Sequence, residues 1–167
     1  MSRGTIAPPP RSRLYLDTSA YLCILLGEEE SERLSRETES AELLSSVLLV
    51  LEARRNLIRL AREGTLTPEQ YETCLDRLEQ DTSRFVLRDV TLDLCQSTVL
   101  PAVITPRSLA LAHLRTALWF HGVEKIDRFV TIDSAQEQAA KELGLPVERG
   151  KRAPPRRSQE RGERRGQ

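Results

Sequence analysis

The chain has few cysteines, and their positions fit neither a disulfide framework nor a zinc site. Cys23, Cys74 and Cys95 are odd in number and widely spaced along 167 residues. Small disulfide-rich domains usually carry even numbers of cysteines, and structural zinc sites need closely spaced pairs. We therefore expect reduced cysteines in a cytoplasmic protein.

Long apolar runs and internal repeats are also missing. The longest strongly apolar stretch, residues 43–51, is far shorter than the roughly 20 residues that a membrane-spanning helix needs. Residues 1–13 are polar and contain three consecutive prolines, a composition unlike that of a signal peptide. The sequence therefore predicts a soluble protein with no membrane partner.

The formal net charge is zero, but the charges are unevenly distributed. Residues 149–167 carry a net +6, residues 1–13 carry +3, and residues 14–148 carry −9. The two ends have little apolar surface to bury, so we expect disordered tails at 1–13 and 149–167 around one domain at 14–148. A body this negative repels a phosphate backbone, unless metal ions or clustered arginines reverse the local field.

Between the tails, short β-type runs alternate with longer helical patterns. We expect strands at 14–16, 85–88, 129–132 and 146–148, and helices at 28–39, 51–63, 68–81, 91–103, 107–121 and 134–143. Residues 47–50 are too short a run to decide between a second strand and the start of a helix. The alternation predicts a three-layer α/β/α fold with a central parallel sheet flanked by helices.

Three carboxylates stand where such a fold would place a site. Asp17 follows the first strand, Asp133 follows the strand at 129–132, and Glu52 opens an amphipathic segment. In open α/β sheets the functional crevice lies at the carboxyl ends of the strands. Each residue could instead have a purely structural role. Asp17 and Asp133 could be helix caps, and Glu52 could form an ordinary salt bridge with Arg55 or Arg59.

The order of four segments, 14–20, 49–55, 107–114 and 129–133, resembles the PIN domain family, and most closely its VapC-type toxin ribonucleases. The similarity covers residues 14–148 and implies an endoribonuclease that uses Mg²⁺ or Mn²⁺ to polarise phosphate and activate water. It implies catalytic and metal-binding roles for Asp17, Glu52 and Asp133, with Ser19 and Thr131 as neighbours. It further implies an RNA substrate, a cognate antitoxin protein and a homodimer.

Ala110 departs from the pattern, because the similar proteins usually carry an Asp there, one turn before a His. Either the natural protein lost the acid and kept its fold, or an engineered Asp→Ala change made a toxic nuclease tolerable to an expression host. The intact flanking residues favour the second explanation. In both cases fewer anionic ligands remain, and we expect catalysis to be poor or absent.

Two further positions and two competing functions complete the expectations. His113 is more typical of a packed, hydrogen-bonded histidine than of a general base. Trp119 and Phe120 are expected in the core or at a dimer interface. The runner-up function is a non-catalytic PIN module that binds RNA or protein. A phosphorylated receiver domain is disfavoured, since paired acids at the first strand and a Lys at the end of the last strand are missing.

Overall fold

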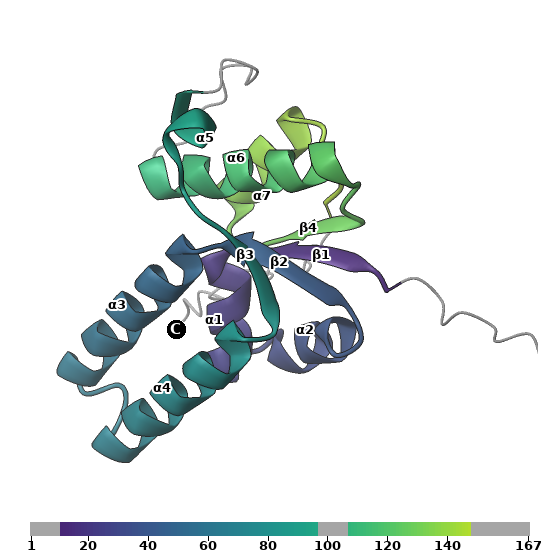
Figure 1. Cartoon of the computed structure of the whole chain (residues 1–167). Coiled ribbons are helices and arrows are strands. Elements are labelled where there is room, and N and C mark those ends of the chain that lie inside the picture. Colours follow the sequence, from purple (N-terminus) through teal and green to yellow (C-terminus); the bar gives the residue numbers. More distant parts are fainter. Residues whose placement is uncertain (1–10, 97–106, 148–167) are drawn as a thin grey trace, which may run out of the picture.

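The computed structural model describes residues 11–96 and 107–147. Its four strands form one parallel sheet in the order β3-β2-β1-β4 (Figure 1). The strands are β1 (Arg13–Leu16), β2 (Glu42–Ser46), β3 (Phe85–Arg88) and β4 (Arg128–Val130). The central parallel sheet expected from the sequence is thus confirmed.

Helices cover both faces of the sheet. In Figure 1, α1 to α4 lie on one side of the strands and α5 to α7 on the other. The helices of the described residues are α1 (Thr18–Leu26), α2 (Ser31–Thr38), α3 (Leu48–Arg62), α4 (Pro68–Thr82), α5 (Leu92–Gln96), α6 (Ser108–Val123) and α7 (Ser134–Glu142). The protein therefore has the three-layer α/β/α architecture that the alternating pattern predicts.

The central strand β1 is buried on both faces, because successive side chains of a strand point to opposite sides. Tyr15 packs with Phe120 and Phe129 in the core beneath α6 and α7. Leu14 and Leu16 pack in a second core on the side of α1 and α2. The two cores hold β1 rigidly, so the residues that follow it have a fixed position.

The strand order contains a reversal that matters for function. From β1 the chain winds through β2 to β3 on one side, and it then returns to place β4 on the other side of β1. In open α/β sheets such a switch point leaves a crevice outside the carboxyl ends of the two strands. Here the two strands are β1 and β4, and Asp17 and Asp133 follow them in the chain.

The second strand lies earlier in the chain than the apolar run at 47–50. The strand β2 ends at Ser46 and α3 begins at Leu48, so of the two alternatives left open for residues 47–50, the start of a helix is confirmed. Ser45 is fully buried in β2, and its hydroxyl donates to the carbonyl of Leu16 at 2.6 Å. This bond satisfies a polar side chain in a central strand, a position where apolar residues are the usual choice.

Other element ends differ by a few residues from those expected. The strand β1 already includes Arg13, β4 ends at Val130, and Val147 pairs with Phe129 in an isolated parallel bridge. Residues 1–10, 97–106 and 148–167 lie outside the described residues, and with them most of both expected tails and part of the helix expected at 91–103. Within the described parts of the chain, no helix combines the length and apolarity needed to cross a membrane.

Candidate functional site

Asp17 performs the helix-capping role that the sequence offered as one alternative, and it has further hydrogen-bond donors besides. It is the N-cap of α1, where its Oδ1 accepts from the backbone N–H of Ala20 at 3.0 Å and from the hydroxyl of Ser19 at 2.7 Å. Its Oδ2 accepts from the hydroxyl of Thr131 at 2.6 Å. The carboxylate is therefore held at both oxygens, by donors from α1 and from the segment after β4.

The surroundings of Asp17 make its charged form costly. The residue is 5% exposed, and burial raises the pKa of its carboxyl group above the ordinary value, although the hydrogen bonds from Thr131, Ala20 and Ser19 act in the opposite direction. A carboxylate that is buried and incompletely compensated gains from a nearby cation. This electrostatic property suits a metal ligand.

Ser19 and Thr131, expected as neighbours of the site, are joined to each other as well as to Asp17. Their hydroxyl oxygens lie 3.1 Å apart. The backbone N–H of Ile132 donates to Ser19 Oγ at 3.1 Å, and that of Asp133 donates to Thr131 Oγ1 at 3.0 Å. These bonds fasten the start of α1 to the segment after β4, and they fix the orientation of Asp17.

Glu52 lies in α3, and its partners differ from those of an ordinary surface glutamate. Its Oε1 accepts from the hydroxyl of Thr18 at 3.0 Å and lies 2.9 Å from His113 Nε2. Arg59, an expected salt-bridge partner, instead pairs with Glu63 at 2.9 Å. Burial alone raises the pKa of Glu52, but the hydrogen bonds from His113 and Thr18 and the nearby charge of Arg55 act in the opposite direction, so the net pKa is lowered.

Asp133 is a helix cap, which is the purely structural role that the sequence also allowed for it. Its Oδ1 accepts from the backbone N–H groups of Ala135 and Gln136, at 2.8 and 3.1 Å, at the start of α7. Unlike Asp17, it is exposed. The cap leaves its second oxygen without a hydrogen bond among the described residues, so a cap and a site carboxylate are compatible here.

One cavity of about 830 Å³ brings together all four positions of the expected acidic pattern, Asp17, Glu52, Ala110 and Asp133. Polar side chains that recognise anions or amides surround it. Its other lining residues are Thr18, Ser19, Leu22, Arg55, Asn56, Arg107, Ser108, Leu109, His113 and Gln136. The segments that were grouped by their order in the sequence thus meet in space.

Ala110 stands in the first turn of α6 and offers the cavity a methyl group in place of an oxygen ligand. Its backbone carbonyl accepts from the side-chain amide of Gln136 at 3.0 Å, which ties α6 to α7 at this position. A carboxylate in the first turn of a helix is favoured by the helix dipole. The backbone at position 110 is therefore suited to an acidic residue.

Several polar residues of the cavity, among them Arg55, Arg107 and Gln136, were not recognised as site residues in the sequence. Arg55 follows Glu52 by three positions on α3, and Arg107 immediately precedes α6. Gln136 is 5% exposed, and its Oε1 has no hydrogen-bond partner in the described residues. The spacing of Arg55 from Glu52 was a usable signal, because residues three apart share a helix face. Gln136 had no comparable signal.

The donor chemistry of the cavity fits Mg²⁺ or Mn²⁺, which prefer carboxylate oxygens. Among the described residues, Glu52 Oε2 and Asp133 Oδ2 accept no hydrogen bond, so they can meet a cation without losing one. The number of ligands is smaller than that of a complete site. Within residues 11–96 and 107–147, no three His, Cys, Asp or Glu side chains are placed to hold one metal ion together.

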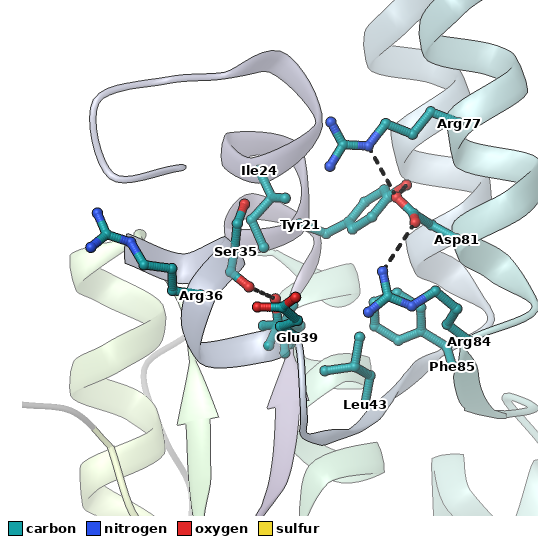
Figure 2. Close-up of a pocket in the computed structure, with 12 residues that line it drawn as sticks. Tyr21, Ile24, Ser35, Arg36, Glu39, Leu43, Arg77, Asp81, Arg84 and Phe85 are labelled. Carbon is teal, nitrogen blue, oxygen red and sulfur yellow. Dashed lines mark hydrogen bonds and ion pairs between the residues drawn. The ribbon is translucent and has the colours of Figure 1, made fainter. Parts of the chain in front are cut away.

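A second cavity, of about 340 Å³, lies beside α1, α2 and α4 (Figure 2). The hydroxyl of Tyr21 donates to Asp81 Oδ2 at 3.2 Å, and Arg77 and Arg84 each lie 3.5 Å from the same carboxylate. This cluster links α1 to α4. None of the four positions of the acidic pattern lines the second cavity, so it is separate from the candidate site.

Comparison with known proteins gives a structural similarity and no family. No family model matches the chain, and no curated protein matches it. The chain is similar to the crystal structure of PAE2754 from Pyrobaculum aerophilum, with 16% sequence identity and a TM-score of 0.49, over 82% of this chain and 83% of that one. A similarity this low supports no conclusion about function, and the PIN assignment remains a prediction.

Proposed function

We propose that this protein is built as a metal-dependent endoribonuclease of the PIN type. The observation that supports the proposal is the meeting of Asp17, Glu52 and Asp133 in one cavity at the switch point of the sheet. Arg55 and Arg107 line the same cavity and supply the positive charge that an acidic body needs to receive a phosphate backbone. The combination suits phosphodiester hydrolysis.

The roles of the residues follow from their contacts. Asp17 and Glu52 would bind Mg²⁺ or Mn²⁺, water would fill the remaining positions, and Asp133 would hold one of these waters from the other side of the cavity. The bound ion would supply a polarised phosphate and a water of lowered pKa. Ser19 and Thr131 orient Asp17 through the hydrogen bonds to its two oxygens.

Ala110 supports a second candidate, a non-catalytic module of the same fold that binds RNA. The methyl group at this position removes one anionic ligand from the cavity and leaves Arg55 and Arg107 in place. Such a cavity retains cationic contacts for RNA while its affinity for metal falls. The two candidates differ in their response to metal. Only the nuclease should be stabilised by a divalent metal and should cleave RNA in its presence.

The wider biological proposal is that the chain is the toxin of a toxin–antitoxin pair. A cognate antitoxin would cover the cavity, the active form would be a homodimer, and the setting would be the cytoplasm. These statements rest on the family resemblance and on the convergence of the acidic residues.

Restoring a carboxylate at position 110 tests the proposal. In Ala110→Asp we expect Mn²⁺ to raise the melting temperature more than in the present chain, because a further carboxylate joins the cavity. A ligand at about 100 times its Kd adds about 2.7 kcal/mol of stability. Metal-dependent cleavage of a labelled single-stranded RNA should appear or rise by orders of magnitude. Thermal denaturation and gel analysis measure the two effects.

Two variants control this experiment. Ala110→Asn has nearly the same size as the Asp variant but no charge, so it should respond to Mn²⁺ much less. Asp17→Asn in the Ala110→Asp protein should abolish both effects. If Ala110→Asp shows unchanged metal stabilisation and no cleavage, the metal-site proposal is wrong, and the RNA-binding module is the better account.

A further inference from the structure

His113 is a buried histidine with polar partners on both ring nitrogens. It is 2% exposed and lies on α6, one turn after Ala110. Its Nδ1 lies 2.9 Å from the hydroxyl oxygen of Tyr15. Its Nε2 lies 2.9 Å from Glu52 Oε1 and 3.0 Å from Thr18 Oγ1. A histidine that merely filled space would not need partners from three other elements.

The chemistry of the partners assigns the direction of the hydrogen bonds. Nε2 faces Glu52 Oε1 at 2.9 Å, and a carboxylate oxygen accepts hydrogen bonds. The ring nitrogen that faces it, Nε2, must therefore carry a proton. In a neutral imidazole the other nitrogen, Nδ1, then accepts, so the Tyr15 hydroxyl at 2.9 Å donates a hydrogen bond to it. The result is a chain from Tyr15 through His113 to Glu52.

This chain connects the parts of the site that lie farthest apart in the sequence. Tyr15 is fixed in β1 by stacking on Phe129, with ring centroids 5.3 Å apart and planes within 8°. The imidazole then reaches Glu52 in α3 from α6, the helix that carries position 110. One oxygen of Glu52 is thereby held, while its Oε2 accepts no hydrogen bond from the described residues and remains available to the cavity.

We propose that His113, oriented by Tyr15, is the positioning residue of the site: it binds Glu52 Oε1 so that Oε2 faces the cavity, and it fixes the register between α3 and position 110. The role of Glu52 as a site carboxylate rests on the proposed function, whereas the hydrogen bonds that hold Glu52 are independent of it. Hydrogen-bonded partners of metal ligands commonly set ligand orientation, and removing them typically weakens metal binding by about 10–100-fold.

The first test needs no substitution. Two-bond ¹⁵N NMR of the imidazole in the full chain reports which ring nitrogen is protonated. We expect the tautomer with a proton on Nε2 and none on Nδ1. A ring with its proton on Nδ1 alone would overturn the proposal, because Glu52 would then face an acceptor. Tyr15→Phe removes the donor to Nδ1, and it should reduce the population of the Nε2–H tautomer.

A matched pair of variants supplies the second test. The amide of His113→Gln reaches the position of Nε2, whereas that of His113→Asn reaches only Nδ1. Crystal structures should show Glu52 in its original place in the Gln variant and displaced in the Asn variant. If Glu52 keeps its place in the Asn variant, His113 does not position it and the proposal fails.

The same pair separates this proposal from the proposed function. In the Ala110→Asp background, His113→Asn should weaken Mn²⁺ binding by about 10–100-fold, and His113→Gln should restore most of it. If Glu52 moves as expected but Mn²⁺ binds none of the proteins, the positioning network stands and the metal function fails. If Mn²⁺ binds the Asn variant as tightly as the parent, positioning by His113 is refuted.

Discussion

Asp17 shows how one residue serves both the fold and a site. As the N-cap of α1 it accepts from the backbone of Ala20, and a cap of this kind contributes about 1 kcal/mol. Its burial opposes this gain, because an ionised carboxylate loses hydration that its hydrogen bonds replace only in part. Asp17 therefore stabilises α1 as a cap, while burial destabilises its ionised form.

These two opposed effects predict how the stability of the Asp17→Asn variant, compared with the parent, changes with pH. Asn is an equally good N-cap, but it has no charge to bury. Since the folded pKa of Asp17 is raised, its stabilising contribution is complete below the unfolded value and is lost as the pH rises through the folded value. The metal-free Asn variant should therefore gain stability relative to the parent as the pH rises from about 4. Urea unfolding in EDTA at several pH values measures it.

Asp17→Ala is the control for that experiment. It removes both the charge and the acceptor for Ala20, so it should lie below the Asn variant by about 1 kcal/mol at every pH. For a chain of this size that difference corresponds to roughly 2–4 °C in melting temperature. A gap between the Asn variant and the parent that stays constant with pH would contradict the burial of a charged Asp17.

Residues at the strand ends were grouped correctly from the sequence, but contacts between helices were not, for a physical reason. Asp17 and Asp133 follow apolar strands, and the carboxyl ends of parallel strands meet at one edge. The contact between His113 and Glu52 joins two helices 61 positions apart, and no local pattern encodes it. The buried Gln136 likewise depends on how α7 packs against α6. Local sequence patterns indicate where the strands end, whereas the contacts of His113 and Gln136 depend on the packing of helices.

At the scale of elements, strong local signals were reliable, and three of the expected short strands were found, whereas the second strand was missed. The helix α4 begins at Pro68, as expected, because Thr67 and Gln70 form a reciprocal capping box. The strand β2 was missed because its last two residues are serines, while the apolar run after it belongs to α3. Burial of Ser45 is stabilised by a tertiary hydrogen bond, which a local pattern cannot reveal.

The helix α3 also carries two exposed apolar side chains. With α4 it forms a pair that extends away from the sheet (Figure 1). Leu51 and Ile58 are 64% and 45% exposed and lie seven positions apart, on one face of the helix. Trp119, an expected interface anchor, is 38% exposed, and the Arg88 guanidinium lies 4.5 Å from its ring centre.

We therefore predict a homodimer that depends on this face of α3. Light scattering of the full chain should give a mass near twice 18.9 kDa. Ile58→Lys should shift the mass to that of one chain, because a charge in an apolar contact is costly. Val123→Lys, at an exposed apolar residue on α6, is the matched control and should remain dimeric. A parent protein that is monomeric at all accessible concentrations would refute the dimer.

At the scale of the whole molecule, the distribution of charge is the main constraint on a nucleic-acid partner. Residues 14–148 carry a net charge of −9, which repels RNA over most of the surface. At the candidate site, Arg55 and Arg107 stand beside the carboxylates. The carboxylates alone would exclude a phosphate, so the arginines or a bound cation must offset them. Binding should therefore be local to the cavity.

This localisation gives the last prediction, which compares two adjacent arginines. Arg54 and Arg55 are both exposed on α3, but only Arg55 lines the cavity. In the present chain, where cleavage is not expected, Arg55→Gln should weaken the binding of a labelled single-stranded RNA. It should also lower the slope of log affinity against log salt by about 0.7, the value for one lost phosphate contact on a single strand. Arg54→Gln should leave both nearly unchanged. Fluorescence anisotropy over a range of KCl concentrations measures the affinity and the salt slope. Equal effects of the two substitutions would place RNA outside the cavity, because a diffuse electrostatic field does not distinguish neighbouring charges.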